Sequence, residues 1–502
     1  PWNAAQRARL MGPMPGLGDL LGAELVLHGQ ELGQGEVHSL GGLLACNHTL
    51  RRVDLRGARV GASLEGVKSV SAALLFNRTL TALELRDNAL GTKGVMELAE
   101  CLKFNHGSAL LSLDIRGNDL GVIGMRALAD ALASNRSLPL ESLDLSDNRV
   151  GDEGLVVLGG ALRARHVRLR SVSMGKNEIG PEGGRGLWEA LVANKSLTRL
   201  DLSDNALCDD GVLALARALE ANVPLAYLGL STNGISGEGA EGLALALVGN
   251  THLTSLDLHW NEAGVRGGAA IAGMLARNRT LRELDISVNS IGGAGAAALA
   301  GALAGHPSLL RLELHWNQAG PSGARAIADA LTDPGTALRV LGMSSNSIGP
   351  EGAQAIGKAL AQNGALEELT LRGNELESTG VWALADALKS DGTALRALYL
   401  HANGISQDGA KGLAEALKGN STLRVLVLDN NQCKGEGARA LAEAMKENRT
   451  LECLQMRANM LRDAEEAAVG ADLGGRGFRR ASTCRWLRGG EGKVTFASRK
   501  GS

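Results

Sequence analysis

The segment Leu281-Arg-Glu-Leu284-Asp-Ile286-Ser-Val-Asn289 decides the fold of this 502-residue chain. Its apolar residues alternate with polar ones, a pattern typical of a short β-strand with one buried face. An asparagine follows the strand, and Gly295 comes six residues after that asparagine. We therefore predict a strand, a turn at the asparagine, and a helix that the glycine allows to begin tightly.

The same pattern recurs along nearly the whole chain, at steps of 28 to 30 residues. Its asparagines are Asn88, Asn118, Asn148, Asn177, Asn205, Asn233, Asn261, Asn289, Asn317, Asn346, Asn374, Asn403, Asn431 and Asn459. The glycine six residues later is missing only from the last copy, which has Glu465. Two weaker copies precede the others, with Gln30 and Ala58 in the asparagine position, which gives about sixteen repeats.

Leucines four residues apart, such as Leu215 and Leu219, follow the glycines and share one face of a helix. We expect the asparagines that end these helices to adopt the left-handed conformation: Asn194, Asn222, Asn250 and Asn278. One repeat cannot bury its apolar face alone, so repeats must stack. The sequence predicts an α/β fold, a right-handed solenoid horseshoe with a parallel β-sheet on its concave face and helices on its convex face.

The repeat resembles that of leucine-rich repeat proteins of the ribonuclease-inhibitor-like subclass. The resemblance rests on segments such as Leu253-Thr-Ser-Leu256-Asp-Leu258-His-Trp-Asn261-Glu-Ala-Gly264-Val-Arg-Gly267 and covers about nine-tenths of the chain. The same subclass forms the recognition regions of NOD-like receptors and the body of Ran GTPase-activating proteins. Ribonuclease inhibitor itself is rich in cysteine, whereas this chain has six. The resemblance implies a surface that binds another protein.

Composition excludes several other classes of protein. The 52 basic and 54 acidic residues balance, so no overall positive field indicates nucleic-acid binding. No apolar run is long enough for a membrane span. The cysteines form no CxxC pair, which favours free thiols in a reducing compartment, the cytoplasm. We find no catalytic, phosphate-binding or metal-binding motif, so we predict no enzyme activity, cofactor or metal.

Seven Asn-x-Ser/Thr sequons raise the alternative of a glycosylated, secreted protein. They are at Asn47, Asn77, Asn135, Asn194, Asn278, Asn420 and Asn448. They share one phase of the repeat, 11 residues before an asparagine position or, for Asn135, 13 residues before it. We interpret them as structural residues between a helix and the next strand.

Acids dominate the third residue of the predicted strands, which should face the concave side. Eight of the first ten are acidic: Asp54, Glu84, Asp114, Asp144, Asp201, Asp257, Asp285 and Glu313. We expect Arg56, Arg86 and Arg116 to neutralise the first three, and the later acids to form a wall suited to a basic partner. Asp201, Asp257, Asp285 and Glu313 are the candidate partner-binding acids. The alternative is that these acids are solvated polar residues common to every repeat.

Aromatic residues and histidines form the second candidate group on the strands. His259-Trp260 and His315-Trp316 directly precede asparagines of the repeat, and Tyr227, Tyr399 and His401 lie in strand positions. Tryptophan and tyrosine are common anchors of protein interfaces, and a tryptophan beside acids suits a lysine or arginine side chain. The alternative is that each tryptophan packs against the turn.

We place an N-terminal flank at residues 1–16, the repeats at 17–465 and a basic, Gly-rich tail at 466–502 that we expect to be disordered. Residues 473–502 hold eight basic residues and one acid. Ser482 follows Arg479-Arg480-Ala481 and is a candidate phosphorylation site. The tail either folds back onto the acidic wall or is an end without function.

The leading hypothesis is a non-enzymatic scaffold or recognition arm that binds a protein partner through its concave face. The alternative is a GTPase activator resembling the Ran GTPase-activating proteins, although those typically carry an acidic tail and this tail is basic. A third possibility is a spacer without a partner. Sequence does not identify the partner or the oligomeric state.

Overall fold

Each repeat forms one short strand and one helix in the computed structural model, which describes residues 22–462. The chain divides into two compact units, Pro1–Glu262 and Ala263–Ser502. The predicted boundaries at residues 16–17 and 465–466, the basic tail and Ser482 lie outside the described residues.

The first unit contains nine strands in its described part. They are β1 (Glu24–Val26), β2 (Arg52–Asp54), β3 (Ala82–Glu84), β4 (Ser112–Asp114), β5 (Ser142–Asp144), β6 (Ser171–Ser173), β7 (Arg199–Asp201), β8 (Tyr227–Gly229) and β9 (Ser255–Asp257). The helices are α2 (Gln34–Cys46), α3 (Leu64–Phe76), α4 (Gly91–Phe104), α5 (Gly121–Ser134), α6 (Gly151–Leu162), α7 (Pro181–Ala193), α8 (Cys208–Glu220) and α9 (Gly237–Leu247), with a 3-10 turn, η2 (Val60–Ala62), before α3.

The second unit repeats this arrangement. Its strands are β10 (Glu283–Asp285), β11 (Arg311–Glu313), β12 (Val340–Gly342), β13 (Glu368–Thr370), β14 (Ala397–Tyr399), β15 (Val425–Val427) and β16 (Cys453–Gln455). Its helices are α10 (Gly264–Leu275), α11 (Gly292–Leu303), α12 (Gly320–Leu331), α13 (Gly349–Leu360), α14 (Glu377–Leu388), α15 (Gln407–Gly419) and α16 (Lys434–Glu447).

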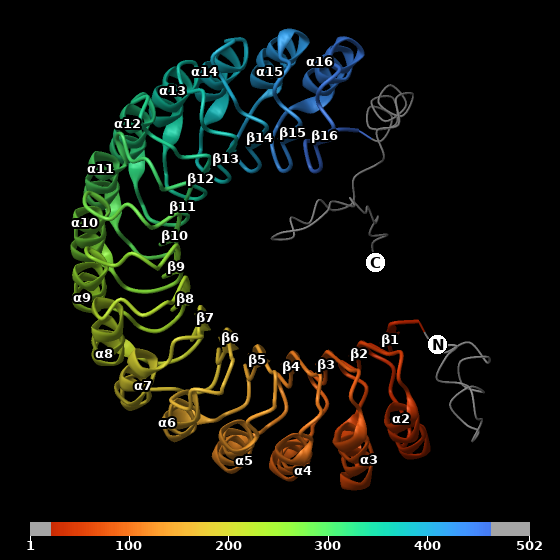
Figure 1. Ribbon diagram of the computed structural model, residues 1–502. Helices are drawn as coiled ribbons and strands as arrows, with labels where there is room; N and C mark the ends of the chain where they lie inside the picture. The colour runs from red at the N-terminus through yellow and green to blue at the C-terminus, as the bar shows by residue number, and fades with distance from the viewer. Residues whose placement is uncertain (1–21, 463–502) are drawn as a thin grey trace. The chain divides into compact units, whose positions relative to one another are not determined.

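Strands within each unit pair in chain order, each parallel to the next, as the sequence predicted. The register aligns equivalent residues, so that Leu83 pairs with Leu113 and Glu84 with Asp114. The helices lie on the opposite side of each unit from the exposed face of its strands (Figure 1). Strand leucines and helix leucines such as Leu284 and Leu299 are buried between the two layers. The predicted α/β repeat fold is therefore confirmed.

The repeat asparagines hold successive turns together through their side-chain amides. Asn346 is fully buried, and its Oδ1 accepts the backbone N–H groups of Asn317 and Ala319, both at 3.1 Å. Its Nδ2 donates to the carbonyl oxygens of Leu314 (2.8 Å) and Ser344 (3.1 Å). An asparagine side chain thus pairs backbone groups that the buried turn would otherwise leave without partners.

A second row of asparagines lies between each helix and the next strand. Asn77 Nδ2 donates to the carbonyl of Leu44 (2.8 Å), and its Oδ1 accepts the N–H groups of Thr79 (3.0 Å) and Leu80 (2.8 Å). All seven sequon asparagines are buried. Their structural interpretation is confirmed, because these buried amides bond the backbone and the fold has no room for a glycan on them.

The expected left-handed conformation of the helix-ending asparagines is wrong for most of them. Asn222 has φ +57°, but Asn194 is extended with φ −77° and ψ 136°. The extended backbone points the side chain at the neighbouring turn, so bonding across repeats, rather than closure of its own helix, selects asparagine here.

His306 replaces an asparagine of this second row. Its Nε2 lies 3.1 Å from the carbonyl oxygen of Asn278, and its Nδ1 accepts the N–H groups of Ser308 (3.4 Å) and Leu309 (3.1 Å). An Nδ1 that accepts carries no proton, so this arrangement needs the neutral ring. Burial accordingly lowers the pKa of His306, and the charge of Arg279 adds to the shift.

Replacing Asn346 by alanine should lower the free energy of unfolding by about 2 kcal/mol or more, because several buried backbone groups lose their partners. The urea midpoint of the full chain measures this change. The matched control is Gln362→Ala, which removes an exposed amide and should leave the midpoint nearly unchanged. Equal effects of the two substitutions would contradict the role assigned to the asparagine row.

Acidification should destabilise the protein partly through His306. Its folded pKa lies below the usual value, so the unfolded chain binds more protons as the pH falls below about 6.5 and the free energy of unfolding falls. His306→Asn restores the residue common at this position and should flatten the decline in urea midpoint between about pH 7.5 and 5.5. Parallel pH curves for the variant and the parent would refute this assignment.

Candidate functional site

Aspartates at the third strand position share one local role. The Oδ1 of each accepts the backbone N–H two residues later, as from Ser203 to Asp201 (3.0 Å) and from Ser287 to Asp285 (2.9 Å). Asp54, Asp114, Asp144 and Asp257 do the same. Part of the acidic column is therefore explained by the repeat itself, because a carboxylate secures the end of the strand.

The first acids of the column form an ion-pair network with two arginines. Arg56 contacts both Asp54 (2.6 Å) and Glu84 (3.0 Å), and Arg52 contacts Glu84 (2.6 Å). The hydrogen bond from the Arg56 side chain is the largest cause of the lowered pKa of Asp54. The predicted neutralisation by Arg56 is confirmed, and Arg52 joins it.

The other two arginines do not pair with the column as expected. Arg86 contacts Asp87 (3.1 Å), and Arg116 gives Asp114 its backbone N–H. Burial raises the pKa of Asp114, and the neighbouring Asp144 adds to this shift. A guanidinium two residues along a strand can turn away from the acid, so spacing alone does not predict the ion pair.

Five predicted residues lie on β7, β8 and β9 of the first unit or in the turn directly after β9, and we call them the β7–β9 patch: Asp201, Tyr227, Asp257, His259 and Trp260. Gly229 separates the two aspartates in the column, and side chains of the patch occupy the space that its missing side chain leaves: a Cβ there would lie 2.7 Å from Asp201 Oδ1 and 3.0 Å from the Tyr227 hydroxyl. The Arg199 guanidinium stacks on the Tyr227 ring, 3.4 Å from its centroid. The patch thus combines carboxylates with a stacked aromatic ring.

Trp260 stands at the edge of this patch and is 61% exposed. Its φ is +56°, in the left-handed region that bulky residues rarely adopt. The rings of His259 and Trp260 meet edge to face with centroids 6.0 Å apart. The His259 Nδ1 is buried without a hydrogen-bond partner among the described residues. The alternative that Trp260 packs against the turn does not agree with its exposure.

In the second unit, Asp285 ends β10 and Glu313 ends the adjacent β11, and His315 and Trp316 follow β11 in the turn; we call these four residues the β10–β11 patch. The His315 Nδ1 accepts the N–H of Ser344 (2.9 Å), so its Nε2 carries the proton and faces Glu313 at 3.0 Å. Trp316 repeats the geometry of Trp260, with φ +56° and 63% exposure.

The Glu313 carboxylate is held from two sides. Arg311 donates to its Oε1 at 2.7 Å, opposite the contact from His315. Burial alone would raise the pKa of Glu313, but hydrogen bonds and charges from His315 and Arg311 outweigh burial and lower it. Glu313 is thus already paired and less available to a partner than the sequence suggested.

Gly342 on β12 provides the space for this pair. A Cβ at Gly342 would overlap the Glu313 carboxylate and lie 2.5 Å from the His315 ring. The two side chains therefore lean from β11 across the neighbouring strand. The gap was visible in the sequence as a glycine in the acidic column, but its use by Glu313 and His315 depends on side-chain directions that spacing does not give.

Tyr399 ends β14, three strands beyond the strand of Glu313 in the sheet order, and His401 follows two residues later. Burial, with the nearby charge of Arg372, lowers the pKa of His401 to about 4. His401 is therefore neutral at ordinary pH, and its Nδ1 is buried without a hydrogen-bond partner among the described residues. These two residues form a separate, uncharged part of the strand face.

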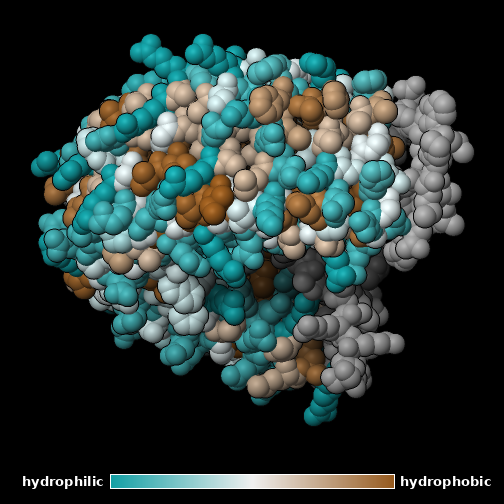
Figure 2. Space-filling view, turned by 90° about the horizontal axis from the view of Figure 1, so that it is seen from below, coloured by the Kyte–Doolittle hydropathy of each residue, from teal (hydrophilic) through white to brown (hydrophobic). Residues whose placement is uncertain are grey.

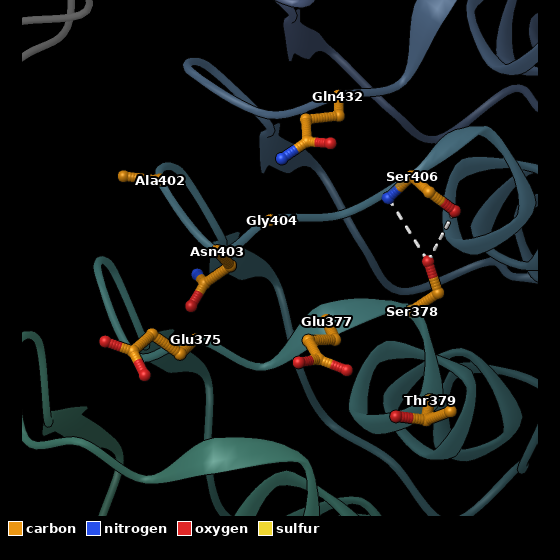
Figure 3. Close-up of a pocket in the computed structure, with 9 residues that line it drawn as sticks. All are labelled: Glu375, Glu377, Ser378, Thr379, Ala402, Asn403, Gly404, Ser406 and Gln432. Carbon is orange, nitrogen blue, oxygen red and sulfur yellow. Dashed lines mark hydrogen bonds between the residues drawn. The ribbon is translucent and has the colours of Figure 1, made fainter.

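The sequence did not reveal a pocket at the loop edge of the second unit, lined by Glu375, Glu377, Gly404 and neighbouring residues (Figure 3). The signal was present, since Glu377 stands where most repeats have glycine. On the face seen in Figure 2, hydrophilic side chains predominate and apolar areas lie between them.

Within residues 22–462, no group of His, Cys, Asp or Glu side chains is arranged to hold a metal ion. Nor does any helix in that range have the length and apolar character that crossing a membrane requires.

Eight segments of the chain match the family described as Leucine Rich repeat: residues 76–99, 109–129, 136–159, 193–216, 249–272, 277–300, 336–357 and 419–442. These eight segments are similar to leucine-rich repeats. A search of curated proteins finds no match.

Solved structures with some likeness include a complex of Rad7 and Elc1 in yeast, at 16% identity over 80% of this chain and 85% of that chain, with a TM-score of 0.44. Another is actin-binding site 2 of leiomodin-1, at 21% identity over 36% of this chain and 87% of that chain, with a TM-score of 0.27. At these values neither likeness indicates what this chain binds.

Replacing Gly342 by alanine should displace Glu313 and His315 and lower the free energy of unfolding by about 1–3 kcal/mol, because the new methyl group has no room. Urea midpoints measure the loss. The matched control is Gly301→Ala in α11, where nothing lies within 4 Å of the added Cβ. That substitution should stabilise the helix by about 0.5–1 kcal/mol. Two changes of the same sign would count against the crowded site.

Proposed function

We propose that this leucine-rich repeat protein is a non-enzymatic binding arm that holds a protein partner on the exposed face of its strands. The observation that carries the proposal is the pair of exposed tryptophans, Trp260 in the first unit and Trp316 in the second, each in the left-handed conformation. Each unit contributes its own patch, β7–β9 or β10–β11.

The backbone conformation at these two positions makes tryptophan unfavourable for the stability of the fold. The position before the repeat asparagine has positive φ throughout, and the other repeats fill it with small or polar residues such as Gly117, Asp147 and Ser345, except for Val288. A bulky residue there costs on the order of 1–3 kcal/mol, and little burial offsets it. Exposed tryptophans are frequent anchors in protein interfaces, which supports a role in binding over a role in packing.

A basic segment of the partner suits the first unit. Asp144, Asp201 and Asp204 form no ion pair with a lysine or arginine among the described residues. The two nearby cations are engaged, Lys176 with Asp147 at 2.8 Å and Arg199 on the Tyr227 ring. A lysine or arginine of the partner could meet these carboxylates and stack on Trp260.

We further propose that the protein is of the ribonuclease-inhibitor-like subclass and acts in the cytoplasm. The 28- to 30-residue repeat supports the ribonuclease-inhibitor-like subclass and a likeness to the recognition regions of NOD-like receptors. The five described cysteines are free thiols, which supports action in the cytoplasm. No feature of the described residues favours the GTPase-activator alternative.

Replacing both Trp260 and Trp316 by alanine should abolish partner capture while leaving the melting temperature unchanged or slightly raised, because the exposed rings add strain and little burial. Affinity purification with the parent chain and the double variant as baits tests capture, and thermal unfolding tests stability. Each single variant should weaken capture about tenfold or more, as expected of an interface anchor.

Trp382 provides the matched control, since it is partly exposed on α14 but packs over Gly412 and donates from Nε1 to the Asp408 carbonyl at 3.3 Å. Trp382→Ala should lower the melting temperature and leave capture intact. A large loss of stability in the double variant, with capture retained, would return both tryptophans to a packing role.

A further inference from the structure

A pocket of about 500 Å³ opens between three successive loops of the second unit (Figure 3). The loops join β13 to α14, β14 to α15 and β15 to α16. Glu375 comes from the first loop and Glu377 begins α14, whereas Ala402 and Gly404 come from the second loop and Gln432 from the third. The pocket is separate from the two patches of the proposed function.

Gly404 makes this space. It directly follows the repeat asparagine Asn403, a position that Glu375 and Gln432 occupy in the repeats on either side. Nothing lies within 4 Å of the point where a Gly404 Cβ would stand. The row of side chains along this edge therefore has a vacancy between a glutamate and a glutamine.

Both glutamates lining the pocket lack a counter-charge. Neither carboxylate forms an ion pair or a hydrogen bond among the described residues. Glu377 also has φ +53°, at a position where Gly121, Gly292 and Gly349 take the left-handed conformation in their own repeats. A glutamate in place of glycine here places a second carboxylate on the wall of the pocket.

Two other pairs of repeats show what fills the vacant position. Arg149 directly follows its repeat asparagine and contacts Asp119, the equivalent residue one repeat earlier, at 3.0 Å. Arg59 contacts Glu31 in the same relation at 2.8 Å. The two arginines have φ +53° and +59°, so this position accepts arginine. Glu375 has the place of Asp119 or Glu31, but Gly404 stands where those two acids have an arginine beside them.

We propose that the pocket binds the guanidinium or ammonium group of an arginine or lysine side chain supplied by a protein partner. The cation takes the position that Arg149 and Arg59 occupy in their repeats, against Glu375, with Glu377 and the Gln432 amide oxygen as further acceptors. Two carboxylates with no third metal-ligating group beside them suit an organic cation better than a metal ion. This site gives the chain a second point of contact, on its loop edge.

N-acetyl-arginine amide, titrated into the full chain labelled with ¹⁵N-glycine, tests the proposal through the amide signal of Gly404. The signal should shift saturably, and the citrulline counterpart, which has the same shape without the charge, should leave it in place. A shift that does not saturate, or an equal response to citrulline, overturns the proposal. Since α14 and α15 begin at the pocket, inorganic phosphate is the third probe, and a response to phosphate alone would make this an anion site.

The double variant Glu375→Gln/Glu377→Gln should raise the dissociation constant at least tenfold. Its matched control is Asp119→Asn, which removes an acid from the equivalent row where Arg149 already fills the neighbouring position. An equal loss in the control would mean that overall charge governs binding and would overturn the site. Tighter binding of agmatine than of N-acetyl-arginine amide would reassign the pocket to a free small cation.

Two further variants separate binding from folding. Gly404→Arg introduces an internal ion pair with Glu375, like that of Arg149 with Asp119. It should keep the melting temperature and abolish the titration, which is followed in this variant at the amide signal of Gly409. Glu377→Gly restores the residue common at this position, so it should keep or raise the melting temperature while weakening binding at least threefold. Full binding by both variants would show that the carboxylates serve only the fold.

Discussion

Side-chain amides that pair buried backbone groups are the constraint on which every repeat depends. The chain turns twice within each repeat, once at each end of the strand. These turns bury N–H and carbonyl groups that the hydrogen bonds of the strands and helices leave without partners. Asparagine carries both a donor and an acceptor on a short side chain, so one residue serves two turns at once. The bonds of Asn346 and Asn77 reach into the preceding repeat, and therefore each turn is ordered by the repeat that follows it.

Because asparagine satisfies the turn, the residues beside it are free to vary in chemistry but not in backbone conformation. The residue before each repeat asparagine is left-handed whether it is Gly117, Lys176 or Trp260. The residue after it is left-handed at Arg149 and Gly404 alike. Both positions project from a fixed backbone toward solvent, so a change of side chain there alters what the surface recognises without altering the fold.

Much of the fold could be predicted from sequence, because the spacing of Asn289 and Leu284 reports bonds and burial that recur in each repeat. The exposure of Trp260 and Trp316 followed from their place beside the asparagine. What could not be predicted were contacts between side chains of different repeats. Contacts within one repeat can also escape prediction: whether Arg86 turns to Glu84 or to Asp87 depends on its rotamer, and spacing allows both.

The pocket was missed for the same reason, since its walls belong to three repeats and its defining residue, Gly404, contributes only a missing side chain. The aspartates of the acidic column are also less available to a partner than the sequence suggested, because each uses one carboxylate oxygen to accept a backbone N–H of its own repeat. Part of the surface that the sequence assigned to binding is therefore local structure. Departures from the repeat, such as Gly342 and Glu377, were better guides to special sites than the residues that most repeats share.

A solenoid tolerates these departures from the repeat because their cost in free energy stays local. A left-handed tryptophan or glutamate costs on the order of 1–3 kcal/mol, a large part of the net stability of a small domain. In a stack, each repeat is stabilised by its interfaces with the repeats before and after it. A strained turn is held in place by the asparagines of those neighbouring repeats. Trp260 lies between the bonded turns of Asn233 and Asn261, which are fixed whatever residue stands at 260. Strain at such a position does not spread along the chain, so the repeat can place large or charged side chains where a partner would meet them.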